Sequence, residues 1–258
     1  MEYEENIVFL SSVIKNTPND AKLYYYRGVM YAETGKYKRA LADYSTAIKL
    51  NPMYAIVYFE RGVVYSNLGK QEEAISDYSR YIQLTPDDAG AYYNRGVACY
   101  HIGEYEKALA DFQKAIQMNL HRVEVYHNLG VTYSALNKPE LAMAAYSKAL
   151  QIDPNYANTY VNRGEHYYSL NKYDEALADY ETAIKLNPNI PEAYNNRGTV
   201  YCALKNYALA IEEFSKAIRL NPKYKEAYNN RGLCYQTLGQ NGKAKTDFAM
   251  AKKLGFRQ

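Results

Sequence analysis

The sequence of 258 residues contains no Trp, only three Cys and no long apolar stretch. Cys99, Cys202 and Cys234 lie far apart and never form a CxxC pair. This spacing argues against a disulfide framework and a zinc site, and it fits a reducing compartment. No apolar run approaches the ~20 residues that span a bilayer, and the acidic N-terminus is unlike a basic secretory signal. We therefore expect a soluble, cytoplasmic protein without a membrane partner.

The sequence also lacks a large excess of positive or negative charge, and it lacks the common catalytic motifs. The net charge is only +3, and no run of five or six like charges occurs, so the bulk charge does not indicate nucleic-acid binding. The chain has no P-loop, GxSxG or HExxH motif. The four His are His101, His121, His127 and His166. None of them stands at the spacing from Cys, Asp or Glu that a catalytic triad or a metal site needs. We expect no enzymatic activity, no metal and no cofactor.

What the chain has in abundance is Tyr, with 31 copies spread evenly. They belong to a longer pattern, because one Gly recurs every 34 residues: Gly28, Gly62, Gly96, Gly130, Gly164, Gly198 and Gly232. Each of these Gly has a Tyr four residues before it, an Ala twelve after it and an aromatic residue sixteen after it. Such a fixed period predicts a solenoid built from seven copies of one unit.

Within each unit the apolar residues have helical spacing. In the fifth unit, Tyr160, Gly164 and Tyr167 form one stripe, and the apolar residues of 176–184 form a second. Pro188 then stops the second helix. Each unit is therefore predicted to be two antiparallel helices of roughly 14 residues, each ~20 Å long.

This pattern resembles the tetratricopeptide repeat family, with which the sequence shares the period and eight recurring slots over residues 21–258. The resemblance implies an all-α fold, a right-handed α-solenoid superhelix of helix-turn-helix repeats. Residues 1–20 fit half a repeat, an N-terminal capping helix. Lys245 and Lys252 replace residues that are apolar in the six earlier units, so we expect the array to be complete at its C-terminus. The seven predicted repeats are 21–54, 55–88, 89–122, 123–156, 157–190, 191–224 and 225–258.

An Arg precedes the repeated Gly in every unit except the fourth, which has Leu129. An acid follows the Gly by fifteen residues in every unit except the fourth, which has Ala145. Because the fourth unit lacks both the Arg and the acid, we predict that the two residues form an ion pair between the two helices of each other repeat. Arg is well suited to a planar, partly buried pair with a carboxylate. The alternative is a ladder of six Arg for phosphate or nucleic acid. The predicted pairs are Arg27/Asp43, Arg61/Asp77, Arg95/Asp111, Arg163/Asp179, Arg197/Glu213 and Arg231/Asp247.

The slot two residues before the Gly carries Asn in five successive repeats: Asn94, Asn128, Asn162, Asn196 and Asn230. An amide offers a donor and an acceptor together, which matches a peptide backbone group. The resemblance implies that such an asparagine ladder holds an extended peptide by its main chain in the concave groove. Asn as a mere polar filler is the alternative, although it is a mediocre helix former.

Neighbouring slots of the predicted groove should set specificity, and we expect contacts from Tyr93, Tyr100, His127, Asn195 and Asn229. Lys22 is the only cation among the groove slots. A clamp for an acidic tail would need several Lys and Arg there, as the resemblance implies, and nucleic acid would need a row of cations. We therefore expect neither partner.

The sequence as a whole predicts a non-enzymatic scaffold that binds an extended peptide or a partner protein. Two alternatives remain open at this point. The chain is the targeting portion of a larger enzyme or complex, or it is a scaffold that self-associates through its edges.

Overall fold

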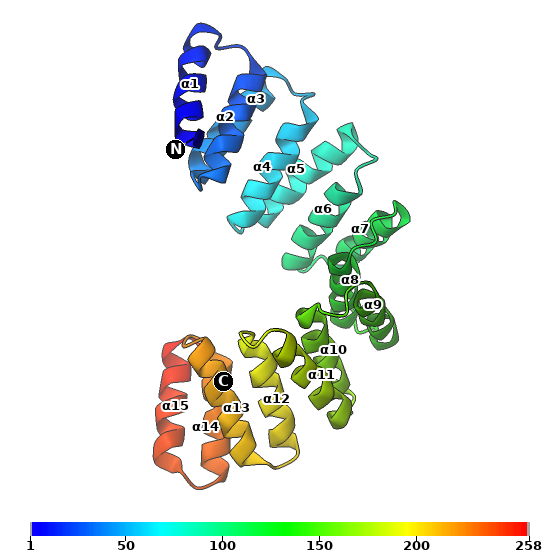
Figure 1. Cartoon of the computed structure of the whole chain (residues 1–258), viewed down its shortest axis with the longest axis vertical. Coiled ribbons are helices and arrows are strands. Elements are labelled where there is room, and N and C mark those ends of the chain that lie inside the picture. The colour runs from blue at the N-terminus through cyan, green and yellow to red at the C-terminus, as the bar shows by residue number, and fades with distance from the viewer. Residues whose placement is uncertain (1, 257–258) are drawn as a thin grey trace. The chain divides into compact units, whose positions relative to one another are not determined.

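The computed structural model describes residues 2–256, and the regular structure within this range is entirely α-helical (Figure 1). All fifteen helices of this range are 13 to 15 residues long. They are α1 (Glu2–Asn16), α2 (Ala21–Glu33), α3 (Tyr37–Leu50), α4 (Ala55–Asn67), α5 (Gln71–Leu84), α6 (Ala89–His101), α7 (Tyr105–Gln117), α8 (Val123–Ala135), α9 (Pro139–Ile152), α10 (Ala157–Ser169), α11 (Tyr173–Leu186), α12 (Pro191–Ala203), α13 (Tyr207–Leu220), α14 (Lys225–Thr237) and α15 (Asn241–Lys253).

The helices form two compact units, Met1–Leu136 with α1–α8 and Asn137–Gln258 with α9–α15. In the first unit, α2/α3, α4/α5 and α6/α7 are tightly packed pairs, α1 packs on α2, and α8 packs on α7. In the second unit, α10/α11, α12/α13 and α14/α15 are the pairs, and α9 packs on α10 (Figure 1). Each unit is therefore a stack of helix pairs, which confirms the all-α repeat fold.

The turn inside each pair is made by a residue in the left-handed region. At Gly69, φ is +74°, and the following N–H of Lys70 donates to the carbonyl of Tyr65 at 2.9 Å. This bond closes a Schellman-type helix end, for which Gly is the preferred residue. Lys205 occupies the same slot with φ of +61°, so the turn geometry persists where Gly is absent.

Small residues bring the two helices of a pair together. A Cβ atom at Gly62 would lie 2.9 Å from Cε1 of Tyr78, closer than a side-chain contact allows. Tyr78 is 2% exposed and Ala74 is fully buried on the same helix. The Gly slot is thus filled by the aromatic ring of the partner helix, which explains why Gly and the aromatic residue recur together. No helix within residues 2–256 has the length and apolar character of a transmembrane segment.

Candidate functional site

All six predicted Arg–acid pairs form, each between the two helices of one repeat. Arg61 donates from Nε and Nη2 to the two carboxylate oxygens of Asp77, at 2.7 and 2.8 Å. The Asp77 side chain is only 6% exposed. The same two-point bonding joins the other five pairs: Arg27–Asp43, Arg95–Asp111, Arg163–Asp179, Arg197–Glu213 and Arg231–Asp247.

The same guanidinium also reaches two rings and a third helix. The Arg61 Cζ atom lies 5.9 and 5.8 Å from the ring centroids of Tyr58 and Tyr65, within cation–π range. Its Nη1 donates to the Ser45 hydroxyl on α3 at 3.0 Å. Arg61 on α4 therefore links α3, α4 and α5, and thereby two repeats. Sequence reasoning missed this Ser, although a Ser stands sixteen residues before five of the six Arg. The Arg Nη1 donates to the Ser hydroxyl at four of these positions: Ser11, Ser45, Ser79 and Ser215.

These contacts decide between the two readings of the arginines. A phosphate ladder needs guanidinium groups that are available to a ligand. The Arg side chains are instead 17 to 24% exposed and paired with carboxylates. The bond to Asp43 is the largest cause that raises the pKa of Arg27. The arginines are structural ion pairs, as the shared exception in the fourth repeat predicts.

The five ladder asparagines lie on the first helices of their repeats, and all are half-buried. In the first unit Asn94 is on α6 and Asn128 on α8, and in the second unit Asn162 is on α10, Asn196 on α12 and Asn230 on α14. We call the side of these helices that carries the asparagines the first-helix face of each unit.

In the second unit three amides form a chain of hydrogen bonds. Nδ2 of Asn230 donates to Oδ1 of Asn195 at 3.2 Å, and Nδ2 of Asn195 donates to Oδ1 of Asn196 at 3.1 Å. Asn195 is 7% exposed, so it lies beneath its neighbours and orients them. Within residues 2–256, Oδ1 of Asn230 and Nδ2 of Asn196 have no protein partner. This row of three hydrogen-bonded amides thus leaves an acceptor, Oδ1 of Asn230, at one end and a donor, Nδ2 of Asn196, at the other.

In the first unit a Tyr takes the place of the middle amide. Nδ2 of Asn128 donates to the Tyr93 hydroxyl at 3.1 Å, and the Tyr93 ring lies 6.0 Å from that of Phe112. Both Asn128 and Tyr93 are half-buried, which leaves part of each accessible. Tyr100, at the end of α6, is also half-buried and lies 5.3 Å from the Tyr105 ring.

A cavity of about 330 Å³ lies beside the amide chain of the second unit. Asn230 lines it together with side chains that are mostly apolar or aromatic: Tyr168, Thr199, Cys202, Ala203, Tyr207, Phe214, Leu233, Cys234 and Thr237. Asn229 lies instead on another hollow, of about 590 Å³, with Phe248 and Phe256 at the end of this unit. Asn230 and Asn229, which are neighbours in the sequence, therefore line different hollows.

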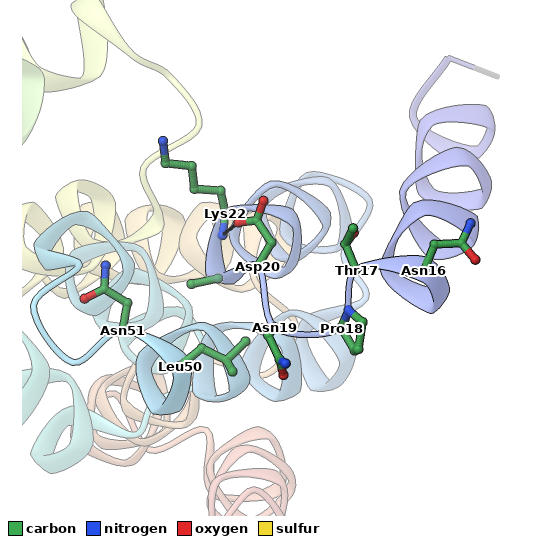
Figure 2. Close-up of a pocket in the computed structure, with 9 residues that line it drawn as sticks. Asn16, Thr17, Pro18, Asn19, Asp20, Lys22, Leu50 and Asn51 are labelled. Carbon is green, nitrogen blue, oxygen red and sulfur yellow. Dashed lines mark hydrogen bonds between the residues drawn. The ribbon is translucent and has the colours of Figure 1, made fainter.

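A third hollow, of about 750 Å³, lies at the turn between α1 and α2 (Figure 2). The Asp20 carboxylate accepts the backbone N–H of Lys22 at 2.9 Å and caps α2. Figure 2 shows Leu50 and Asn51, at the end of α3, on the other side of this turn. The hollow is shaped by capping contacts, and Lys22 itself is exposed. Across residues 2–256, no cluster of three or more His, Cys, Asp or Glu side chains could hold a metal ion.

His127, another predicted contact residue, is half-buried on α8. Desolvation lowers its pKa from 6.5 to about 4. The imidazole is therefore neutral at pH 7, and it offers a ligand no positive charge.

The lowered pKa of His127 predicts a loss of stability in acid. The folded chain binds this proton more weakly than the unfolded chain, so stability is present above pH 6.5 and is lost as the pH falls toward 4. We expect His127 to contribute on the order of 2–3 kcal/mol to this loss. Chemical denaturation of the wild type and His127→Gln at several pH values measures it, because the Gln variant lacks this component. Parallel stability curves for the two proteins would contradict the assignment.

Stacked helix pairs with a Gly–aromatic contact in each pair define a class of protein, the α-solenoids of helix-turn-helix repeats. The family model described as "TPR repeat" matches residues 28–69, 65–103, 164–205 and 198–239, more than half of the chain. Models described as "Tetratricopeptide repeat" match residues 9–42, 89–120, 123–156 and 225–254. The chain belongs to the tetratricopeptide repeat family.

Solved structures agree with this assignment. A tetratricopeptide repeat protein from Parabacteroides merdae has 20% identity, covers 92% of this chain and 94% of its own, and gives a TM-score of 0.78. YrrB, described as a TPR protein with an unusual peptide-binding site, has 26% identity, covers 71% and 95%, and gives 0.54. MamA has 25% identity, covers 66% and 92%, and gives 0.61. A search of curated proteins gave no significant match.

Proposed function

We propose that this protein is a non-enzymatic scaffold that binds an extended peptide segment of a partner protein along a first-helix face. The Asn230–Asn195–Asn196 chain carries the proposal, since it fixes an acceptor and a donor on neighbouring repeats. A peptide backbone needs both kinds of partner. The similarity to YrrB, a repeat protein with a peptide-binding site, supports the same function.

The internal bonds of the ladder favour binding because they reduce its cost. A free Asn side chain loses rotamer freedom when it binds, whereas one held by its neighbours has lost that freedom already. Each bond to the peptide main chain adds about 0.5–1.5 kcal/mol. A micromolar complex needs about 8 kcal/mol, so the ladder supplies only part of it. The apolar cavity next to Asn230 is suited to supply more by burying one peptide side chain.

We expect Asn196→Ala with Asn230→Ala to weaken peptide binding about tenfold, since two main-chain bonds of about 0.5–1.5 kcal/mol are lost. A random peptide library identifies ligands of the wild type, and titration calorimetry then compares the variants.

The control is Asn189→Ala, in the exposed turn before α12 of the same unit, where the backbone N–H of Asn189 donates to Oδ1 of Asn187 and is kept in the variant. This control should bind like the wild type. Equal affinity of the double variant and the wild type, with unchanged circular dichroism, would remove the ladder from the proposal.

A further inference from the structure

Two cysteines that are 32 residues apart in the sequence meet in the second unit. The sulfur atoms of Cys202 on α12 and Cys234 on α14 lie 2.8 Å apart. Both are free cysteines. The two helices are the first helices of consecutive repeats and contact each other directly. A bond between these sulfurs would therefore join one repeat to the next.

The two thiols share one hydrogen bond, in which either sulfur can donate. This contact lets one sulfur stabilise the thiolate of the other, and the bond to Cys202 lowers the pKa of Cys234. The thiolate is the reactive form of Cys. Because the two sulfurs lie in contact, the Cys that reacts with an oxidant has the other Cys beside it as its resolving thiol.

A small oxidant has a route to the pair. Both cysteines line the cavity of about 330 Å³ beside Asn230. Cys202 is half-buried, whereas Cys234 is 2% exposed and belongs to a core cluster with Ala210 and Phe214, so an oxidant reaches the pair through this cavity. Cys99 gives a contrast within the same chain. It is also 2% exposed, but burial raises its pKa to about 11, and no second Cys within residues 2–256 lies beside it.

We propose that Cys202 and Cys234 form a reversible oxidation site, at which hydrogen peroxide converts the two thiols into a disulfide that cross-links α12 to α14. The thiolate of one Cys attacks one peroxide oxygen, an S–O bond forms, the O–O bond breaks, and the departing hydroxide takes up a proton as water. The sulfur of the other Cys then attacks the sulfenic sulfur, the S–S bond forms, and the S–O bond breaks. The second hydroxide leaves with the proton of this second thiol as water, so two thiols and one peroxide give one disulfide and two waters.

The geometry fits this product. A disulfide needs sulfurs about 2.05 Å apart, so the present separation must shrink by only about 0.8 Å. The bond would close a loop between two repeats that are otherwise held by side-chain packing. Solenoid repeats are stabilised mainly by their nearest neighbours, so the cross-link should protect α12 to α14 most strongly. This site does not depend on the peptide-binding function.

Oxidation of the intact chain with hydrogen peroxide tests the proposal. We expect the mass to fall by two hydrogen atoms, and peptide mapping to find Cys202 joined to Cys234 while Cys99 remains open to alkylation after denaturation. A thiol reductant should restore the mass. The thermal midpoint of the second unit should rise by about 5–10 °C on oxidation. Amide hydrogen exchange should slow in α12 to α14 and stay unchanged in α2 to α7.

Matched variants make the result specific. Cys99→Ser should still lose two hydrogen atoms, whereas Cys202→Ser and Cys234→Ser should not form an intramolecular disulfide. Each of these two variants should instead accumulate oxygen at its remaining Cys of the pair, because the sulfenic acid lacks its resolving thiol. Three results would each overturn the proposal: separate oxygen adducts on Cys202 and Cys234 in the wild type, a disulfide that joins two chains, or one that involves Cys99.

Discussion

Replacement of Arg61 by Leu is expected to lower the free energy of unfolding of the first unit by about 3 kcal/mol. The change leaves the Asp77 carboxylate, 6% exposed, without the two bonds that now neutralise it. An uncompensated charge in such a place costs more than the net value of the pair itself. The bond to Ser45 is lost as well. Urea or guanidinium denaturation followed by circular dichroism measures the effect.

A double variant separates the charge from the packing. Arg61→Leu with Asp77→Ala reproduces the combination that the fourth repeat carries at Leu129 and Ala145, both of which are buried. Removal of both partners should therefore recover much of the loss. Lys70→Ala is the control, because the Lys70–Glu73 pair is about half exposed and should contribute less than about 1 kcal/mol. Additive losses for the two substitutions at Arg61 and Asp77 would contradict the assignment.

Truncation of Phe214 to Ala should lower the free energy of unfolding of the second unit by about 3–5 kcal/mol, a typical cost for a buried aromatic residue. Phe214 is fully buried on α13. Its ring fills the space beside Gly198, where a Cβ atom would lie 2.8 Å from Cε1. The substitution leaves a cavity between α12 and α13 that neither backbone can close without moving. Denaturation of the wild type and the variant gives the difference.

Leu209→Ala on the same helix is the matched control, since this Leu is 39% exposed. It should cost less than about 1 kcal/mol. Because a solenoid is held by contacts between neighbours, the loss at Phe214 should also speed amide exchange in α12 to α14 more than elsewhere in the unit. Equal losses for the two substitutions would contradict the central role given to the ring.

The sequence could predict the contacts that stay within one repeat. The Gly–aromatic contact and the Arg–acid pair recur in register, so seven copies act as an internal comparison. Arg61 and Asp77, for example, are sixteen residues apart like every other pair, and the fourth repeat loses both partners at once. Such contacts depend only on how two adjacent helices pack, which the period itself specifies.

Contacts between repeats were harder to predict. Asn230 meets Asn195 at a separation of 35 residues, and Cys234 meets Cys202 at 32, so neither follows the 34-residue period. These offsets depend on how one helix pair is rotated against the next. The sequence therefore placed the asparagines on the right helices but did not show that their amides bond to one another. The contact between Cys202 and Cys234 could not be predicted for the same reason, because it too depends on the rotation between successive helix pairs.

The central claim is that Asn side chains on a first-helix face hold the main chain of a peptide. The most direct test is a double-mutant cycle between Asn230→Ala and a peptide ligand N-methylated at successive backbone amides. At the amide that donates to Oδ1 of Asn230, methylation should weaken binding to the wild type by about 0.5–1.5 kcal/mol and have almost no effect on the variant. If methylation at every position weakens binding to the wild type and to Asn230→Ala equally, the peptide main chain does not bind this side chain and the claim is wrong.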